Sequence, residues 1–337
     1  MMMETARAVF FISGYAVGEI GLAVVPSVLP KSAGTWKPFG IGAHSMRSFA
    51  EYRLKELVRL EYLKDFLQQT RNDFMLRRYL NKPAAGEREF LEQCGRLAGR
   101  NIIAVIAFEQ PLVLDWLLSL GKRRLVEFEI LVFDNSLRPA LRQEIEAVCR
   151  KHGTPYLALP ANTTRHVNRS HGLAMSWVFH RIVRAIEPRY FGFLDHDMLP
   201  AGDIGIIDKL ERQPVYGLAN RGIDDYWNLW AGYCFFDYRQ TLGMPLNFLY
   251  DFSRELDTGG RNWDVLYKTI DPARLLFAPT DNREIENRIS GKKRTVQFVD
   301  DQWIHIGGVS YNNNFDEKHA FFSELFSQMM REAGIPA

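Results

Sequence analysis

Four short apolar runs, each separated from the next by an amphipathic segment, constrain most strongly what this chain can fold into. They read "NIIAVIAF" from Asn101, "FEILVFDNS" from Phe128, "YLALP" from Tyr156 and "YFGFLDHD" from Tyr190. Runs that are apolar on both faces are typical of strands in a parallel sheet covered on both sides. The helical patterns between them supply that cover. The sequence therefore predicts an α/β fold with a mostly parallel sheet and helices on both faces.

The composition indicates a globular chain without a strong overall charge. Of its 337 residues, 47% are apolar, which is enough for a substantial core. The formal net charge of +2 creates no field that would attract nucleic acid, so we predict no nucleic-acid partner. Three widely separated cysteines form neither a disulfide framework nor a thiolate metal site, which predicts a reducing, cytoplasmic location.

The stretch "ARAVFFISGYAVGEIGLAVVPSVLP" near the N-terminus is apolar, but Glu19 and several glycines and prolines interrupt it. Neither half reaches the roughly 18 uninterrupted apolar residues of a membrane-spanning helix, so we predict no transmembrane span. Only Arg7 supplies the positive charge that a signal peptide would use, and Glu4 offsets it. The pattern leaves a peripheral contact with a membrane open.

Two helical patterns precede the first strand. Over residues 45–80 apolar residues recur at three- and four-residue spacing between charges, and residues 87–97 repeat the pattern. We therefore predict a mainly helical N-terminal arm over residues 1–98, which packs on the rest of the chain or acts as a separate binding module. The main domain follows over residues 99–337, with an amphipathic helix over about 316–333.

Polar residues stand where two of the predicted strands end. Asp134 and Asn135 follow the second strand, and Asp195 and Asp197 end the fourth, in "FGFLDHDMLP". Ligands of parallel sheets bind outside the carboxyl ends of the strands, so these side chains should share one crevice. Carboxylates one residue apart suit hard cations such as Mg²⁺ or Mn²⁺; the alternative is that one of them caps a following helix. The usual dinucleotide and P-loop fingerprints are absent.

The order of four motifs between about residues 101 and 200 resembles a known family. The motifs are "AVIAFEQPLVLDWLLSL", "EILVFDNS", "NTTRHVNRSHGLAMSW" and "FGFLDHD". Together they resemble the GT-A glycosyltransferases, in particular glycosyltransferase family 2. The resemblance implies a Rossmann-like GT-A fold with a nucleotide-binding half over about 99–205 and an acceptor half over about 206–315. It also implies a metal-dependent enzyme that transfers a sugar, with inversion, from a nucleotide diphosphate-sugar to a hydroxyl of a carbohydrate or lipid-linked acceptor.

The resemblance assigns the predicted cation, Mn²⁺ or Mg²⁺, to three residues. Asp197 binds the metal directly, while Asp195 supports a metal-bound water or the ribose. Many GT-A enzymes use a late histidine as a further protein ligand, and His305 in "DDQWIHIGG" has the matching place; its alternative is an ordinary core histidine. His196 alternates away from the two acids if the strand continues, so we predict that the metal's histidine is His305 and not His196.

The resemblance also implies contacts with the donor nucleotide. Asp134 would hydrogen-bond the base, with Asn135 and Ser136 shaping the turn; the alternative is an ordinary Asx turn after a strand. Asn168 and His171, in "NRSHG", would face the same crevice as donor contacts. For His171 the alternative is a local hydrogen bond at the start of a helix.

A basic segment late in the chain, within "GKKRTVQF", belongs to a polar loop that could close over the donor's diphosphate. The alternative is solvated surface, which is what most charge runs are. The residues concerned are Lys292, Lys293 and Arg294.

An inverting transferase needs a carboxylate that removes the proton of the acceptor hydroxyl. In the less regular second half we predict Asp257, in "LDTGG", for this role, with Asp264 in "NWDVL" as the reserve. The alternative for Asp257 is a turn residue ahead of two glycines. Four aromatic residues would stack on an acceptor sugar or belong to the core: Tyr226, Trp227, Trp230 and Trp263.

Two other functions compete with sugar transfer. A nucleotidyltransferase that makes the activated sugar would also use paired acids and a metal, but it would want a glycine-rich, basic loop after the first strand. That position reads "AFEQPLV", which carries an acid and no basic residue. The second alternative is a catalytically inactive sugar-binding or scaffold protein, because fold alone does not establish function. The sequence specifies neither the sugar, the nucleotide base nor the oligomeric state.

Overall fold

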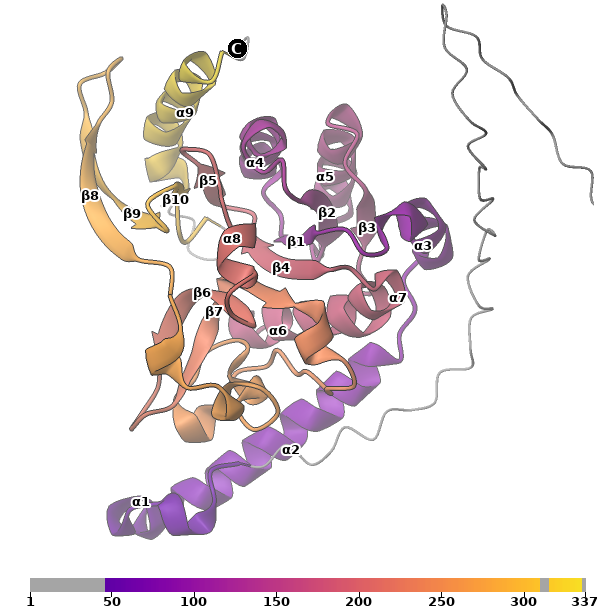
Figure 1. Ribbon diagram of the computed structural model, residues 1–337, viewed down its shortest axis with the longest axis vertical. Coiled ribbons are helices and arrows are strands. Elements are labelled where there is room, and N and C mark those ends of the chain that lie inside the picture. The colour runs from indigo at the N-terminus through magenta and orange to yellow at the C-terminus, as the bar shows by residue number, and fades with distance from the viewer. Residues whose placement is uncertain (1–45, 310–314, 335–337) are drawn as a thin grey trace, which may run out of the picture. The chain divides into compact units, whose positions relative to one another are not determined.

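The computed structural model describes residues 46–309 and 315–334 (Figure 1). The apolar N-terminal stretch and the first part of the predicted arm lie outside these residues, and the division into an arm and a main domain stays a prediction. Within the described ranges, no helix combines the length and apolar character that crossing a membrane requires.

The N-terminal helices are α1 (Leu54–Val58), α2 (Glu61–Leu80) and α3 (Glu87–Cys94). The single helix predicted from about residue 45 is interrupted at Leu60, whose left-handed backbone, with φ of 57°, separates α1 from α2. Leu76 and Leu80 face inward from α2, which packs against α6 (Val167–Val178). The long helix α2 therefore adds its inner side to the main core.

A six-stranded sheet forms the centre of the fold, in the order β3-β2-β1-β4-β7-β6. The first four strands are mutually parallel, as predicted, whereas β7 runs antiparallel to both β4 and β6. The strands are β1 (Ile102–Ala107), β2 (Glu129–Asp134), β3 (Tyr156–Ala158), β4 (Tyr190–Asp195), β6 (Val215–Arg221) and β7 (Trp227–Asp237).

Helices cover both faces of this sheet, which confirms the predicted fold class (Figure 1). Alternate residues of β1 enter different cores: Ile103 and Val105 pack with α4 and α5, while Ala104 and Ile106 pack with α3 and α6. The helices are α4 (Pro111–Arg124), α5 (Pro139–Lys151), and α6, which continues through a π-helical turn (Phe179–Val183) into α7 (Arg184–Ile186).

A second sheet, in the order β5-β10-β9-β8, stands at the carboxyl end of β4. Its strands are β5 (Met198–Pro200), β8 (Thr280–Glu286), β9 (Lys293–Val299) and β10 (Trp303–His305), and α9 (Phe315–Glu332) packs on it. The expectation of a polar loop at Lys292–Arg294 is therefore wrong in part, because Lys293 and Arg294 begin β9 and pair with β8. Along the chain, the short helix α8 (Ile207–Leu210) follows β5. Residues 238–279, between β7 and β8, form turns and short 3₁₀ segments.

Candidate active site

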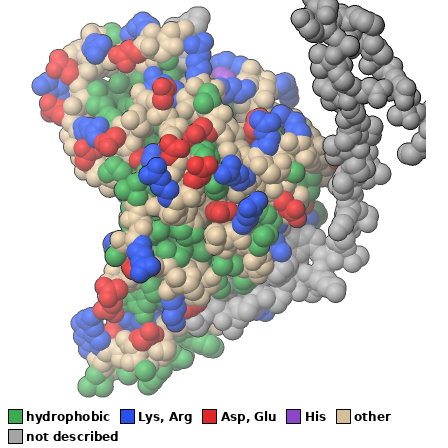
Figure 2. Space-filling view, viewed as in Figure 1, with side chains coloured by type: hydrophobic (Ala, Val, Ile, Leu, Met, Phe, Trp, Pro, Cys, Tyr) green, Lys and Arg blue, Asp and Glu red, His purple; other side chains and the backbone are tan. Residues whose placement is uncertain are grey.

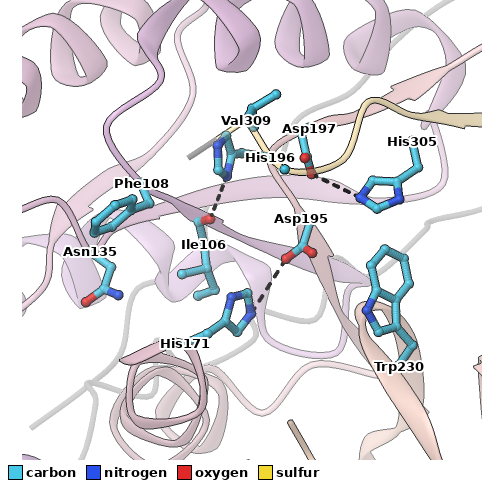
Figure 3. Close-up of a pocket in the computed structure, with 11 residues that line it drawn as sticks. Ile106, Phe108, Asn135, His171, Asp195, His196, Asp197, Trp230, His305 and Val309 are labelled. Carbon is cyan, nitrogen blue, oxygen red and sulfur yellow. Dashed lines mark hydrogen bonds and ion pairs between the residues drawn. The ribbon is translucent and has the colours of Figure 1, made fainter. Parts of the chain in front are cut away.

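A cavity of about 170 Å³ lies where β1 and β4 end and the second sheet begins (Figure 3). Predicted site residues line it from several elements: Asn135, His171, Asp195, Asp197 and His305, together with Trp230 from β7. The structure thus brings together side chains that are up to 170 residues apart in sequence (from 135 to 305).

The two acids of the "DHD" motif enter this cavity from the end of β4. Asp195 is the last residue of β4 and pairs with Ile106 of the parallel strand β1, so backbone hydrogen bonds fix its position. Burial, with the nearby negative charge of Asp197 as a second cause, raises the pKa of Asp195 to about 7. Because two negative carboxylates so close together repel each other, the pair calls for a positive partner. His196 lies between them but turns toward the carbonyl oxygen of Ile106, at 3.3 Å.

His305 reaches the same cavity from the second sheet. Strand β10 pairs with β5, which places His305 opposite Met198, the residue after Asp197. Nδ1 of His305 lies 2.7 Å from Oε1 of Gln297, which can only accept, so Nδ1 is the donor; in the neutral ring Nε2 carries the lone pair, and it lies 3.7 Å from Oδ1 of Asp197. A lone pair that faces a carboxylate oxygen across this distance suits a cation between them, and the Gln297 contact orients the ring for it.

Among the described residues, His171 and Asn135 each present a polar atom without a hydrogen-bond partner in this region. Nε2 of His171 is buried, accepts or donates no hydrogen bond within the described ranges and lies 3.6 Å from Oδ1 of Asp195. Burial lowers the pKa of His171 to about 4, so the imidazole is neutral at pH 7. Nδ2 of Asn135 donates to Ser170, while its Oδ1 is buried and has no hydrogen-bond partner among the residues that the structure describes. Unpaired buried polar atoms are costly, and their presence in a cavity points to a ligand that would satisfy them.

The two candidates for the general base, Asp257 and Asp264, have different contacts in the structure. Oδ1 of Asp257 accepts hydrogen bonds from Nδ2 of Asn168 at 2.5 Å and from the backbone N–H of Thr258 at 2.7 Å. The charge of Asp257 acts on the pKa of His171 and of Asp195, so it lies within electrostatic reach of the cavity. Asp264 instead forms an ion pair with Arg254 at 3.2 Å. Asn168 therefore orients the candidate base, a contact that its position in the sequence did not reveal.

Asp134 and Ser136 lie beneath the cavity and not in its lining. Asp134 is fully buried, its Oδ1 accepts the backbone N–H of Ser136 at 2.8 Å, and its Oδ2 accepts the hydroxyl of Tyr156 at 3.0 Å. Oγ of Ser136 in turn accepts the backbone N–H of Glu109 at 2.7 Å. These contacts form the Asx-type turn named as the alternative, and the contact of Asp134 with a nucleotide base stays a prediction.

The basic segment and the aromatic residues are dispersed. Lys292 and Lys293 are exposed, and Nζ of Lys293 lies 3.2 Å from Oε1 of Glu284 on the neighbouring strand. Trp227 belongs to the core, where it packs against Tyr267, whereas the other predicted aromatic residues are only partly buried. Of those four aromatic residues, the one in the cavity lining is Trp230, whose ring centroid lies 5.0 Å from that of His305.

Sequence reasoning missed two residues that shape the cavity. A Cβ atom added to Gly232 would lie 2.5 Å from Oδ2 of Asp195 and 2.4 Å from the ring of Trp230, so only glycine leaves room here. Its signal was a glycine inside a strand, which often marks a close approach. Nζ of Lys318 on α9 donates to the carbonyl oxygens of Ile306 and Gly307 and thereby fixes the chain that follows His305. Nothing local in the sequence marked Lys318.

Two buried arginines fasten α2 to the region around Asp257. Arg169, which follows Asn168, donates from Nε to Oδ1 of Asn72 at 2.7 Å and from Nη2 to the hydroxyl of Tyr250 at 2.7 Å. Arg261 forms an ion pair with Asp73 at 3.1 Å. The inner side of α2 therefore braces one side of the candidate site.

The sequence matches no protein-family model and no curated protein. The structure is similar in part to solved glycosyltransferases, among them the bifunctional enzyme WbbM in its apo form, at 12% identity and a TM-score of 0.35 over 54% of this chain and 39% of that one. Another is the galactosyltransferase LgtC with donor and acceptor sugar analogs, at 16% identity and a TM-score of 0.28; the match covers 41% of this chain and 58% of that one. The mannosyltransferase PcManGT from Pyrobaculum calidifontis, with GDP-Man and Mn²⁺, is similar at 13% identity and a TM-score of 0.29, and the match covers 55% of each chain. The matches span about half of those structures, and we draw the function from the residues of the cavity.

Proposed function

We propose that the protein is a glycosyltransferase that moves a sugar from a nucleotide diphosphate-sugar to an acceptor hydroxyl, with inversion and with Mn²⁺ or Mg²⁺. The observation that carries this proposal is the meeting of Asp195, Asp197 and His305 in one cavity at the carboxyl end of β4. Two partly desolvated carboxylates and an imidazole lone pair form a donor set for a divalent cation and a diphosphate.

The donor set fits a metal that is held jointly by protein and substrate. Within the described ranges, no three side chains of His, Cys, Asp or Glu are grouped closely enough to hold a metal ion alone. Asp197 and His305 would supply the protein ligands, Asp195 would lie beside them, and diphosphate oxygens would complete the shell. The bound cation would neutralise the charge that develops on the leaving diphosphate.

The unpaired atoms of Asn135 and His171 would contact the donor. Neutral His171 can donate or accept a hydrogen bond, and Oδ1 of Asn135 can accept one from a hydroxyl or an N–H group. At about 170 Å³, the cavity is smaller than the roughly 300–1,000 Å³ of pockets that enclose a whole drug-sized ligand. We therefore assign to it the diphosphate and sugar end of the donor, and not the entire nucleotide.

Asp257 is the proposed general base. The three hydrogen bonds from Asn168 and Thr258 all go to Oδ1, and Oδ2 accepts none from the described residues. Oδ2 would take the proton of the acceptor hydroxyl as its oxygen bonds to the anomeric carbon of the sugar. The bond from that carbon to the diphosphate breaks in the same step, and its electron pair leaves with the diphosphate.

Release of nucleoside diphosphate from a panel of sugar donors, measured with and without Mn²⁺, tests the proposal. We expect release from at least one donor with Mn²⁺, and a loss of about 100-fold or more in Asp197→Ala because a charge-stabilising group is removed. Asp203→Ala, an exposed acid outside the cavity, should keep wild-type activity. If no donor is turned over and donor binding survives Asp197→Ala, the catalytic proposal is wrong.

A further inference from the structure

Helices α1 and α2 carry a series of exposed apolar side chains. On α2 they recur at three-, four- and seven-residue spacing, which places them on one face, opposite the buried face that packs on α6. Figure 2 shows hydrophobic side chains gathered at the end of the molecule where Figure 1 places α1. We call this series the outer stripe; its members, 49–78% exposed, are Leu54, Val58, Leu63, Phe66, Leu67 and Phe74.

A line of basic residues runs beside the outer stripe. Lys64, Arg71 and Arg78 are exposed and spaced by seven residues, so they lie above one another on the same side of α2. Within the part of the chain that the structure describes, these three side chains form no ion pair. Lys55 and Arg59, also exposed, extend positive charge to α1.

The acidic residues of the same two helices are largely occupied by contacts with other parts of the fold. Glu56 pairs with Arg47 at 2.7 Å, Asp65 accepts the hydroxyl of Tyr52 at 2.8 Å, and Asp73 pairs with Arg261. The inward contacts of these carboxylates leave apolar and positive groups on the outer side. An exposed apolar surface of this size indicates an interaction site.

We propose that α1 and α2 dock on an anionic lipid surface. The outer stripe enters the boundary between headgroups and acyl chains, and Lys64, Arg71 and Arg78 contact lipid phosphates. Leucine and phenylalanine beside lysine and arginine form the composition of helices that lie in the plane of a membrane surface. This inference is independent of the proposed sugar transfer, because it uses residues on the opposite side of α2 from those that brace the cavity.

The charges favour a lipid surface over a second copy of the chain. A two-fold contact between outer stripes would bring the same patch against itself, and the basic line would meet a surface of equal charge. Of the four carboxylates on α1 and α2, three are held by Arg47, Tyr52 and Arg261, and the fourth, Glu61, is only partly exposed. Anionic lipids supply the missing negative charge without such a cost.

Vesicle flotation of the full chain tests the inference. We expect binding to vesicles of phosphatidylcholine and phosphatidylglycerol in equal parts, weaker binding as salt is raised, and little binding to phosphatidylcholine alone. Equal partition to both kinds of vesicle would overturn the charge argument, and no binding to either would overturn the proposal.

Matched variants test whether binding depends on the proposed docking surface or only on the overall charge and apolar surface of the protein. Reversal of the basic line (Lys64→Glu, Arg71→Glu, Arg78→Glu) should weaken binding by about tenfold or more. Reversal of three exposed basic residues elsewhere (Arg212→Glu, Arg239→Glu, Lys268→Glu) should weaken it far less. Leu63→Gln with Leu67→Gln should also release the chain, whereas Val126→Gln with Leu242→Gln, at residues that are more exposed, should not. Equal effects of target and control variants would contradict the proposal.

The reactivity of an engineered thiol tests whether the outer stripe is already covered by another part of the chain or by a second copy. The three native cysteines are buried, so Leu67→Cys adds the exposed thiol. We expect rapid reaction with a maleimide in solution and protection by the anionic vesicles. Protection without vesicles would show that residues 1–45 or a second copy occupies the stripe, and would overturn the proposal.

Discussion

The two sides of the candidate site are held in place in different ways. Asp195, Asp197 and His305 lie at strand ends, where backbone pairing of β4 with β1 and of β10 with β5 sets their positions. Asp257 lies among turns and short 3₁₀ segments, and its support comes from side chains, through Asn168 and the arginines that reach α2. Distant side-chain changes should therefore disturb the Asp257 side and leave the strand-end side in place.

The largest effect on activity is expected at Asp257, and the same change at Asp264 should have a different result. Asp257→Asn should lower kcat by about 100-fold or more, because the proton of the acceptor loses its base. Asp264→Asn should instead lower the free energy of unfolding by about 2 kcal/mol, since it weakens the contact with Arg254. Steady-state kinetics and urea unfolding of both variants measure this, and the reverse pattern would assign the base to Asp264.

The brace from α2 should matter for stability and for activity. Asp73→Ala removes the carboxylate that pairs at 3.1 Å with the buried guanidinium of Arg261, which should cost about 3 kcal/mol and lower kcat through the position of Asp257. Adding Arg261→Met should restore much of the stability.

Asp65→Ala, on the same helix, provides the control. It removes the hydrogen bond from Tyr52 and touches neither Arg169 nor Arg261, so it should cost about 1 kcal/mol and leave kcat unchanged. Urea unfolding and kinetics at a temperature where every variant is folded distinguish the two changes. Equal loss of activity in Asp73→Ala and Asp65→Ala would contradict a specific brace.

The pH dependence of stability reports on the strand-end side. The folded-state pKa of Asp195, about 7, lies above its ordinary value, so this group's contribution to stability falls as pH rises from about 4 to 7. The pKa of His171, about 4, lies below its ordinary value, so its contribution rises with pH between about 4 and 6.5. The opposing slopes should nearly cancel in the wild type.

Single variants reveal each slope. Without metal, the Tm of His171→Asn should fall from about pH 4.5 to 7, while that of Asp195→Asn should rise over the same range, because each keeps only the other group's titration. Thermal unfolding across this range measures both. Profiles that remain parallel to that of the wild type would contradict the shifted pKa values.

The smallest effect on stability and activity is expected at the exposed strand pair β8–β9. Lys293 lies on β9 and pairs with Glu284, and an exposed pair of this kind contributes less than about 1 kcal/mol. Lys293→Ala should therefore change both stability and the donor KM very little. A rise of about tenfold in the donor KM would instead support the predicted contact of this segment with the diphosphate.

The same contrast explains how much of the molecule could be predicted. The strands from Ile102 to Asp195 were predictable because apolar runs of strand length are a local signal, and Asp195 and Asp197 follow directly from the strand that carries them. The structure brings His305 into the cavity and its role as a metal ligand stays a prediction, but the small second sheet that carries it left only short, mixed patterns in the sequence. The contacts Asn168–Asp257 and Asp73–Arg261 join residues 89 and 188 positions apart, and no periodicity marks such polar pairs.

Isothermal titration of UDP and GDP, with and without Mn²⁺, into the wild type and Asp197→Ala tests the central claim most directly. We predict that Mn²⁺ strengthens the binding of at least one nucleoside diphosphate by about tenfold or more, and that Asp197→Ala loses this gain while Asp203→Ala keeps it. Equal affinity with and without Mn²⁺ in the wild type, or an undiminished gain in Asp197→Ala, would contradict a metal and diphosphate site at the end of β4.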